Sequence, residues 1–441
     1  MARQTGKRFR RRALERALRF MAKTVLLRYR PLVVGVTGSV GKSSTKEAIA
    51  LVLSSSMRVR KSEGNFNNEI GVPLTILGAD SGGSSFLRWL LVGFRFLRLV
   101  LFPTKYPQAL VLEMGVDRPG DMSYLLEFVP VKIGAVTRIA ESHLAYFGSI
   151  ANIAKEKGRM ISSLPEDGFA ILNADDPRAF RMAEKTKAVV LSYGFSAHAS
   201  VRADNILFQE SDGNLGSSFK LNYDGKTIPV RLPHVIARHH ISDALAGAAV
   251  GIALGMNLVE IASALERLEP LPGRLRFLHG RNGMGILDDT YNSSPASVRA
   301  ALETIQEVPS RRKVVILGDM LELGADSETE HRALAADVAA SGAELVILAG
   351  KRMRLLGEEL LSSGFSRGNV MLFPDPDSIS NALDGVLREG DLVLVKGSRG
   401  MRMEKVTEVI LRNPSEAKEL LCCQSPDWRN RSFTPPAEWD N

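Results

Sequence analysis

Residues 35–44 read Gly-Val-Thr-Gly-Ser-Val-Gly-Lys-Ser-Ser, and they join a short apolar run at 31–36 to a stretch of helical character at 44–53. Strand, glycine-rich turn and helix in this order are typical of a phosphate-binding loop. The glycines let backbone N–H groups approach an anion, the lysine reaches the outer phosphates, and the neighbouring hydroxyl can bind Mg²⁺. The start of the helix adds the positive end of its dipole. The sequence therefore predicts a nucleotide site, although Val36 stands where the strict pattern has glycine.

The chain on either side of this loop predicts an α/β fold. Further apolar runs at 109–112, 133–137 and 169–173 are separated by helical stretches, which is typical of a mainly parallel sheet. Residues 197–231 instead alternate polar and apolar residues between turn signals, and predict a small antiparallel insert. A helical stretch at 240–268 follows.

A proline-rich break at 269–274 marks the expected boundary to a second domain. Four more strand-like runs after it predict a C-terminal Rossmann-like α/β domain; they lie at 284–288, 313–317, 344–349 and 392–396. The expected organisation is a basic amphipathic segment at 1–30, a central P-loop ATPase domain at 31–270, the C-terminal domain at 271–412, and a disordered tail at 413–441.

The net charge of +8 is concentrated at one end of the chain. Residues 1–30 contain eleven Lys or Arg and one acidic residue, Glu15, so the remaining chain is close to neutral. This distribution excludes a general nucleic-acid-binding surface. The two cysteines, Cys422 and Cys423, are adjacent, which excludes a disulfide framework and a cysteine zinc site.

Two basic amphipathic stretches predict peripheral contact with an anionic membrane surface. In residues 8–28, apolar side chains recur at helical spacing with arginines between them. Residues 86–102 read FLRWLLVGFRFLRLVLF, which is too short and too charged to predict a membrane span. The alternatives are a leader that is solvated or packed on the protein body for the first stretch, and a core or lid helix for the second.

Two residues could complete the nucleotide site by holding a metal ion. Glu113 follows the run at 109–112, and His143 follows the run at 133–137. A carboxylate at the end of a parallel strand can face the loop, and Mg²⁺ prefers hard oxygen ligands. Each residue alone is more often structural, and only their combination with the loop makes them metal candidates.

Several segments, taken in order, resemble the Mur ligase family, and within it the branch that adds D-alanyl-D-alanine to a peptidoglycan precursor. They extend over about residues 31–410, and the segments are 35–46, 65–73, 113–115, 142–144, 154–158, 172–177, 288–295, 317–324 and 395–399.

The resemblance implies a role for each matching residue. The nucleotide would contact Thr37, Gly38, Ser39, Val40, Gly41, Lys42, Ser43, Ser44, Asn173, Arg274 and Asp289. Lys42, His143 and Lys157 would be catalytic, and Mg²⁺ would be held by Ser43, Glu113, His143 and Lys157, with Lys157 carbamylated as in relatives. Substrate contacts would be made by Asn67, Asn68, Asn292, Ser293, Lys396 and Arg399.

Two departures from the family pattern concern the base and the acceptor. In the segment 237–244, His240 replaces the asparagine expected beside the adenine, which puts base selectivity in doubt. Only residues 1–30 precede the region of the loop, where family members have a domain for the uridine nucleotide. We therefore expect that domain to be absent.

The implied activity is an ATP-dependent carboxylate–amine ligase of peptidoglycan precursor synthesis and cell wall biogenesis. It would join D-alanyl-D-alanine to a muramyl-peptide through an acyl phosphate, with ATP and Mg²⁺ as cofactors. We expect a cytoplasmic monomer, peripheral at the inner face of the membrane, that binds no nucleic acid. The alternatives are a family member with a different, lipid-linked acceptor, and a membrane-tethered scaffold that binds ATP without ligation.

Overall fold

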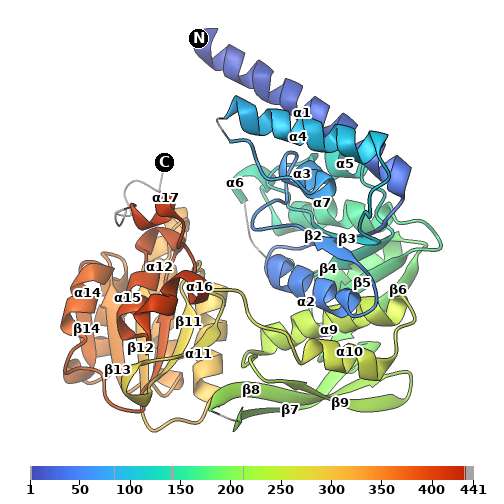
Figure 1. Ribbon diagram of the computed structural model, residues 1–441. Helices are drawn as coiled ribbons and strands as arrows, with labels where there is room; N and C mark the ends of the chain where they lie inside the picture. The colour runs from blue at the N-terminus through green and yellow to red at the C-terminus, as the bar shows by residue number, and fades with distance from the viewer. Residues whose placement is uncertain (1, 84, 141–143, 212, 432, 434–441) are drawn as a thin grey trace. The chain divides into compact units, whose positions relative to one another are not determined.

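The computed structural model describes residues 2–83, 85–140, 144–211, 213–431 and 433, and its ribbon is drawn in Figure 1. The chain forms two compact units. The first contains Met1–Ile206, Ser218–Leu232 and His239–Leu268, and the second contains Leu207–Ser217, Pro233–Arg238 and Glu269–Asn441.

The first unit is built on a nine-stranded sheet with the order β2-β3-β1-β4-β5-β6-β7-β8-β9. Neighbours from β2 to β7 pair in parallel. The central strands are buried along nearly their whole length, which is why they read as continuous apolar runs. The parallel strands are β1 (Leu32–Thr37), β2 (Val59–Lys61), β3 (Ala109–Glu113), β4 (Ile133–Val136), β5 (Phe169–Asn173) and β6 (Val189–Gly194).

The alternating stretch predicted as a small insert extends this sheet. It forms β7 (Val201–Ser211), β8 (Asn214–Tyr223) and β9 (Lys226–Leu232), which are consecutive neighbours in the sheet. Asp224 and Gly225 join β8 to β9 with φ values of 48° and 71°. Two positive φ values are typical of a type I′ hairpin turn, so β8 and β9 are antiparallel as predicted.

Ten helices of the first unit surround the sheet in the described residues (Figure 1). The stretch 240–268, expected as one helix, is divided at Gly255, whose φ is 74°. The helices are α1 (Ala2–Tyr29), α2 (Lys42–Ser54), α3 (Gly71–Leu77), α4 (Phe86–Leu101), α5 (Asp121–Leu126), α6 (Leu144–Phe147), α7 (Ile150–Ser162), α8 (Pro177–Phe180), α9 (Arg238–Ala253) and α10 (Leu258–Leu265).

Helix α1 is part of the core of the first unit. Leu18, Ala22 and Val25 are fully buried and belong to the same apolar cluster as residues of α3 and α4. The alternatives to membrane contact for the basic segment were a solvated leader and one that packs on the protein body. In the structure, one face of α1 packs on the body. Its opposite face stays exposed.

The second unit holds a six-stranded sheet with the order β10-β11-β15-β12-β13-β14. Five strands pair in parallel and β10 lies antiparallel at the edge, which confirms the predicted α/β domain. The strands are β10 (Arg276–His279), β11 (Gly285–Asp289), β12 (Lys313–Gly318), β13 (Leu345–Ala349), β14 (Val370–Phe373) and β15 (Leu392–Lys396). The longer helices are α11 (Pro295–Glu307), α12 (Ser327–Ala340), α13 (Met353–Ser362), α14 (Pro376–Ala382) and α15 (Glu404–Ile410).

The prediction of a disordered tail is wrong for residues 413–431. This stretch contains η6 (Pro414–Glu416), α16 (Ala417–Leu420) and α17 (Pro426–Arg429). Ala417 and Leu421 are buried in a core cluster of the second unit, and Arg402 donates to the Trp428 carbonyl at 2.6 Å. The polar composition of the segment gave no indication that these few residues would be buried. Residues 434–441 lie outside the described part of the chain.

Candidate active site

The predicted phosphate loop joins β1 to α2. Gly38 has φ 149°, and a Cβ there would lie 1.8 Å from the Thr137 hydroxyl oxygen. Gly41, with φ 86°, precedes the first residue of α2. A left-handed backbone and a close neighbour both favour glycine, so the local structure depends on these two positions.

The loop is also tied to the segment that follows β4. The Arg138 carbonyl accepts from the backbone N–H groups of Ser39, at 2.7 Å, and of Val40, at 3.4 Å. In this structure these two N–H groups are therefore hydrogen-bonded to a carbonyl of the protein. The N-cap of α2 is Gly41, which makes no side-chain capping bond, and the first turn of α2 is the end where helix geometry favours an anion. Lys42 folds back, and its Nζ donates to the Ser39 carbonyl at 3.2 Å.

The structure places Glu113 beside the loop, as the strand pattern suggested. β3 pairs with β1 so that Glu113 is level with Val36. The Glu113 side chain is buried, with Oε2 accepting from Ser43 Oγ at 2.8 Å and Oε1 from Asn67 Nδ2 at 3.1 Å. A buried carboxylate beside a hydroxyl offers the hard oxygen atoms that suit Mg²⁺. His143 lies outside the described residues.

Lys157, on α7, is buried in the same region. Burial and then the charge of Lys42 lower the pKa of its amine to about 7, partly offset by Asp117, Glu156 and Glu113. Buried amines lose their proton readily because desolvation penalises the charged form. A large fraction of the Lys157 amine is therefore neutral at pH 7.

Three other expected residues of the first unit have local partners. Asn67 holds Glu113, as described above. The Asn68 side-chain oxygen, Oδ1, accepts from the backbone N–H groups of Ile70 and Gly71 at the start of α3. The Asn173 side chain, at the end of β5, accepts from the Asp175 N–H at 2.9 Å. Asn68 and Asn173 thus stabilise backbone turns in this structure.

The hydrogen-bonded pair that joins α2 to α9 was not predicted from the sequence. Thr45 Oγ1 donates to Asp243 Oδ1 at 2.5 Å, and both side chains are buried. The buried His240 ring lies 3.8 Å from Asp243 through Nδ1. The segment 237–244 was singled out only for His240, and Asp243 three residues later is the signal that could have revealed this pair.

In the second unit, the expected residues form one cluster at the ends of β11 and β15. Lys396 is buried and its Nζ contacts Asp289 Oδ2 at 2.6 Å and donates to the Asn292 carbonyl at 2.9 Å. Burial lowers the pKa of Lys396, and Asp289 opposes this shift. The Ser293 carbonyl accepts from Ser398 Oγ at 3.4 Å.

Two arginines of this cluster lie over one aromatic ring that sequence analysis did not select. The Tyr291 ring centroid is 4.1 Å from the Arg274 guanidinium carbon and 5.2 Å from that of Arg399. Arg399 also lies 4.2 Å from the Trp428 ring, so the C-terminal segment contributes to the cluster. Both arginines are thereby held in defined positions by cation–π contacts.

Asp288, next to Asp289 in the chain, was also not predicted as a site residue. It lies on the core side of this cluster. Its side chain is fully buried and accepts from Thr290 at 2.8 Å and Thr407 at 3.0 Å. Burial raises the pKa of this carboxyl to about 7 despite these donors. The two neighbouring carboxylates therefore have different surroundings. Asp288 faces the core, and Asp289 faces Lys396.

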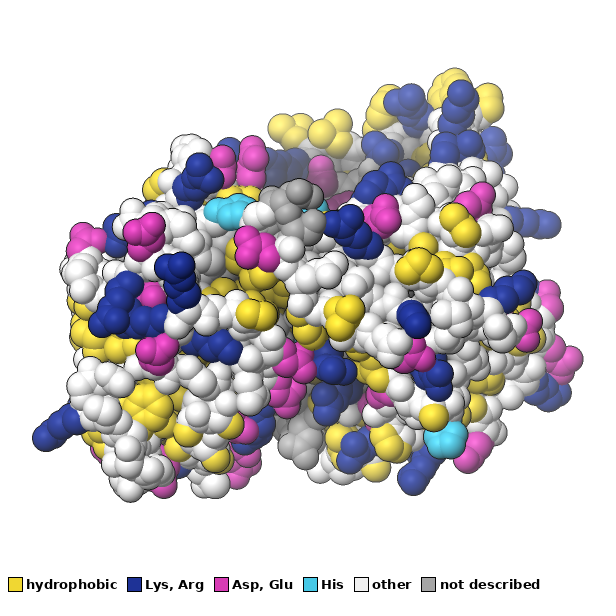
Figure 2. Space-filling view, turned by 90° about the horizontal axis from the view of Figure 1, so that it is seen from below, with side chains coloured by type: hydrophobic (Ala, Val, Ile, Leu, Met, Phe, Trp, Pro, Cys, Tyr) yellow, Lys and Arg dark blue, Asp and Glu magenta, His cyan; other side chains and the backbone are white. Residues whose placement is uncertain are grey.

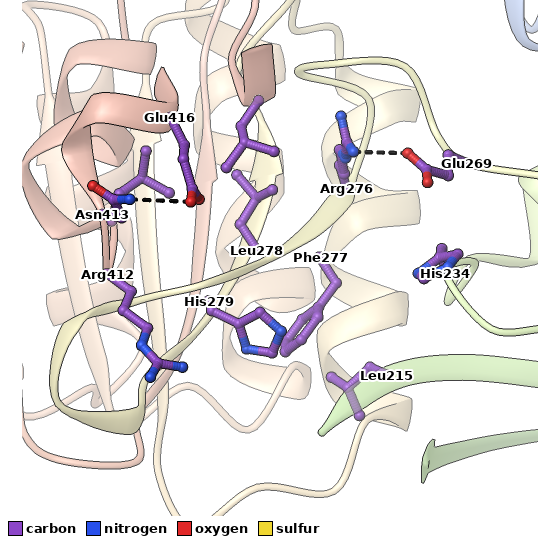
Figure 3. A pocket seen from close by; sticks show the side chains of 12 residues that line it. Leu215, His234, Glu269, Arg276, Phe277, Leu278, His279, Arg412, Asn413 and Glu416 are labelled. Atoms are coloured by element: carbon purple, nitrogen blue, oxygen red, sulfur yellow. Dashed lines mark hydrogen bonds and ion pairs between the residues drawn. The ribbon is translucent and has the colours of Figure 1, made fainter. Parts of the chain in front are cut away.

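A cavity of about 510 Å³ lies elsewhere in the second unit, at the outer edge of β10 (Figure 3). Phe277, His279 and Arg412 line it, as do the ion pair of Arg276 with Glu269 and the bonded pair of Asn413 with Glu416. None of the site residues expected from the sequence is among its lining residues.

Basic and acidic side chains are intermixed over the face drawn in Figure 2.

Comparison with known families identifies both units. The sequence profile of the Mur ligase middle domain matches residues 36–87 and 96–251, and that of the Mur ligase glutamate ligase domain matches residues 273–399. These spans include the phosphate loop, Glu113 and Lys157 in the first unit and the Asp289–Lys396 cluster in the second.

Individual relatives match over most of both chains. The chain is 32% identical over 385 residues to the UDP-N-acetylmuramoyl-tripeptide–D-alanyl-D-alanine ligase of Escherichia coli, covering 86% of this chain and 77% of that protein. It is 30% identical to the Bacillus subtilis ligase of the same name, covering 90% and 80%. The crystal structure of MurF from Thermotoga maritima in complex with ADP has a TM-score of 0.73 and 25% identity, covering 92% and 84%.

Proposed function

The chain belongs to the Mur ligase family, and we propose that it joins D-alanyl-D-alanine to the peptide carboxylate of a UDP-N-acetylmuramoyl-tripeptide. It is an ATP-dependent ligase. The observation that carries the proposal is that relatives of this name match over both units, which contain the phosphate loop and the Asp289–Lys396 cluster. This match supports the proposed acceptor over a lipid-linked one, and ligation over an inactive scaffold.

The reaction activates a carboxylate that would not condense with an amine in water. An oxygen of the acceptor carboxylate attacks the γ-phosphorus of ATP, and ADP leaves. The amino group of the dipeptide then attacks the acyl carbon of the acyl phosphate, phosphate leaves, and the amine nitrogen loses its proton. Such chemistry needs mainly positioning and charge neutralisation.

The residues of the first unit would hold the nucleotide. The N-terminal turn of α2 and the loop Thr37–Ser44 would bind the phosphates, while Lys42 would exchange the Ser39 carbonyl for the transferring phosphoryl oxygens. Asn173 contacts the base side. Asn67 orients Glu113 through the hydrogen bond to Oε1.

Mg²⁺ fits the donor set of Ser43 and Glu113, because a hydroxyl and a buried carboxylate already meet at 2.8 Å. When bound, it would neutralise phosphate charge. The neutral amine of Lys157 can be carbamylated, which turns a cation into an oxygen anion of the kind that suits this metal. His143 is the fourth proposed ligand.

The residues of the second unit have the remaining proposed roles. Arg274 and Asp289 contact the nucleotide, while Asn292, Ser293, Lys396 and Arg399 orient the substrates, and Asn68 lines the acceptor side. The buried Asp289–Lys396 pair and the two arginines stacked on Tyr291 support this assignment, since both arrangements fix charged groups in place.

We also propose that the enzyme is a cytoplasmic monomer in peripheral contact with the inner face of the cell membrane, through residues 8–28 and 86–102. Among the described residues, no helix combines the length and apolar composition needed to cross a bilayer. The exposed faces of α1 and α4 support peripheral contact.

The acceptor is tested by incubating the purified chain with ATP, D-alanyl-D-alanine and either a UDP-linked tripeptide or a lipid-linked muramyl-peptide. We expect phosphate release and a pentapeptide product with the UDP-linked acceptor, and loss of both in Lys42→Ala with unchanged thermal unfolding. Turnover with the lipid-linked acceptor alone would refute the proposed substrate, and ATP hydrolysis independent of both substrates would refute ligation.

A further inference from the structure

Helix α4 carries a large apolar face that is exposed. Phe86, Phe94 and Leu101 have relative exposures of 75%, 67% and 66%. Eight large apolar side chains of α4 and of its C-cap residue are exposed: Phe86, Leu87, Leu90, Leu91, Phe94, Leu97, Leu101 and Phe102. Contiguous apolar patches of this kind mark interaction sites, whereas isolated exposed apolar residues do not.

The helix itself is firmly positioned, so this exposure is a property of the folded protein. Val92 and Leu99 are buried on its opposite face, and Ser85 caps its start. Arg95 Nε donates to the Leu77 carbonyl at 2.9 Å, which joins α4 to α3. The side chains that point outward are therefore held away from the core.

Helix α1 lies beside α4 and adds positive charge (Figure 1). Phe20 packs against Phe96 with ring centroids 6.4 Å apart, and Tyr29 donates to the Leu99 carbonyl at 2.8 Å. Phe20 and Leu27, two turns apart on the exposed side of α1, are 66% and 64% exposed. The apolar surface of α4 thus continues onto α1.

The cations around this surface have few acidic partners. Within the described side chains, Arg11 pairs with Glu15 and Glu69, and Arg19 pairs with Glu127. The other described basic side chains of the two helices, and Arg30 directly after α1, make no ion pair; Arg28 makes a cation–π contact with Tyr29. They are Arg12, Arg16, Lys23, Arg28, Arg30, Arg88, Arg95 and Arg98. Helix α4 contains no acidic residue.

We propose that α1 and α4 form one surface that binds a bilayer containing anionic lipids, with the apolar face of α4 inserted and the cations of α1 against the headgroups. Apolar side chains flanked by Lys and Arg are the combination that suits the interface of an anionic membrane. The inference rests on the peripheral contact proposed above and adds which side chains insert into the bilayer and which meet its headgroups. It does not depend on the ligation reaction.

The charge of the surface favours lipid over a second copy of the chain. Packing two such surfaces together would bring the unpaired arginines of both copies face to face, and like charges repel.

The test is sedimentation of the full chain with vesicles of phosphatidylcholine alone, or of phosphatidylcholine with phosphatidylglycerol. We expect partition into the anionic vesicles to be much stronger than into the neutral ones. The variant Phe94→Ser with Leu101→Ser should lower it about 100-fold, or about tenfold for each side chain. The variant Arg16→Gln, Lys23→Gln and Arg28→Gln should lower it about fivefold for each charge, on anionic vesicles only.

Control variants carry substitutions of the same two kinds elsewhere on the first unit. Val259→Ser removes an apolar side chain that is 66% exposed on α10, and Lys185→Gln with Arg267→Gln removes two exposed cations. Both controls should bind vesicles as the unaltered chain does. Turnover on soluble substrates should be unchanged in all four variants, so failure of ligation and failure of lipid binding can be told apart.

Three outcomes would overturn the proposal. They are absence of binding to anionic vesicles, binding that the two surface variants leave unchanged, and a dimer in vesicle-free solution that Phe94→Ser with Leu101→Ser dissociates. The last result would assign the surface to a second copy of the chain.

Discussion

A lysine amine reacts with carbon dioxide only in its neutral form, and the environment of Lys157 favours that form. Its pKa is lowered to about 7, first by burial and then by Lys42. The neutral fraction therefore rises as the pH increases through 7, whereas an exposed lysine stays protonated throughout this range. Carbamylation, and the activity that needs the resulting oxygen anion, should rise over the same range.

This pH dependence is measured by ¹³C NMR of protein in ¹³C-bicarbonate between pH 6 and pH 9. We expect a carbamate resonance that grows through pH 7 and is absent in Lys157→Ala, whose ligase activity should fall at least about 100-fold. Lys155→Ala changes an exposed lysine on the same helix and should keep both signal and activity. A signal lost in Lys155→Ala but kept in Lys157→Ala would place the carbamate elsewhere.

The Asp289–Lys396 pair should matter for stability as well as for binding. Lys396 is about 1% exposed, so removing the carboxylate leaves a buried cation without its ionic partner. Breaking such a pair typically costs about 3 kcal/mol of unfolding free energy. We expect Asp289→Ala to lower the stability of the second unit by this amount in urea unfolding.

The exposed pair Lys405–Asp377 in the same unit is the matched control. Asp377→Ala should cost less than about 1 kcal/mol, because solvent screens exposed ion pairs. Equal losses for Asp289→Ala and Asp377→Ala would show that the burial of Lys396 has no energetic consequence.

At the level of elements, the phosphate loop depends on a glycine whose neighbours leave no space. A methyl group at Gly38 would overlap the Thr137 hydroxyl, and the φ of 149° is unfavourable for other residues. We expect Gly38→Ala to weaken ATP binding at least about tenfold, measured by calorimetry. Gly93→Ala in α4, where nothing lies within 4 Å of the added carbon, should bind ATP normally. Normal binding by Gly38→Ala would contradict the loop geometry.

The elements that could be predicted from the sequence are those whose signal is local. The buried strands β1, β3, β4, β5, β11, β12, β13 and β15 read as apolar runs because both faces are covered. Short strands such as β2 and β14 did not, since their residues are only partly buried. Their pairing depends on neighbours distant in the chain, which no local pattern reveals.

The residues of the candidate site could likewise be predicted only in part. Lys42, Ser43 and Glu113 were predicted because loop and strand ends have a recognisable pattern, and the structure brings Ser43 and Glu113 into contact. The family resemblance pointed to Arg274, Asp289 and Lys396. The partners Asp243, Asp288 and Tyr291 were missed because each also contacts a residue more than a hundred positions away in the sequence, namely Thr45, Thr407 and Arg399.

For the whole molecule, each unit carries a distinct part of the proposed chemistry. The first unit has the phosphate loop, the carboxylate Glu113 and the neutral amine of Lys157, and the second has the charged cluster around Lys396. We therefore expect ligation to require both units. The α1–α4 surface is separate from these groups in its chemistry, and it would determine where the enzyme works.

The central claim is that the acceptor carboxylate is activated as an acyl phosphate, and oxygen transfer tests it directly. A UDP-linked tripeptide labelled with ¹⁸O in its terminal carboxylate is converted with ATP and D-alanyl-D-alanine, and the released phosphate is analysed by mass spectrometry. The account predicts that each phosphate carries one ¹⁸O atom from the carboxylate, in step with pentapeptide formation. Unlabelled phosphate released alongside the same product would contradict it.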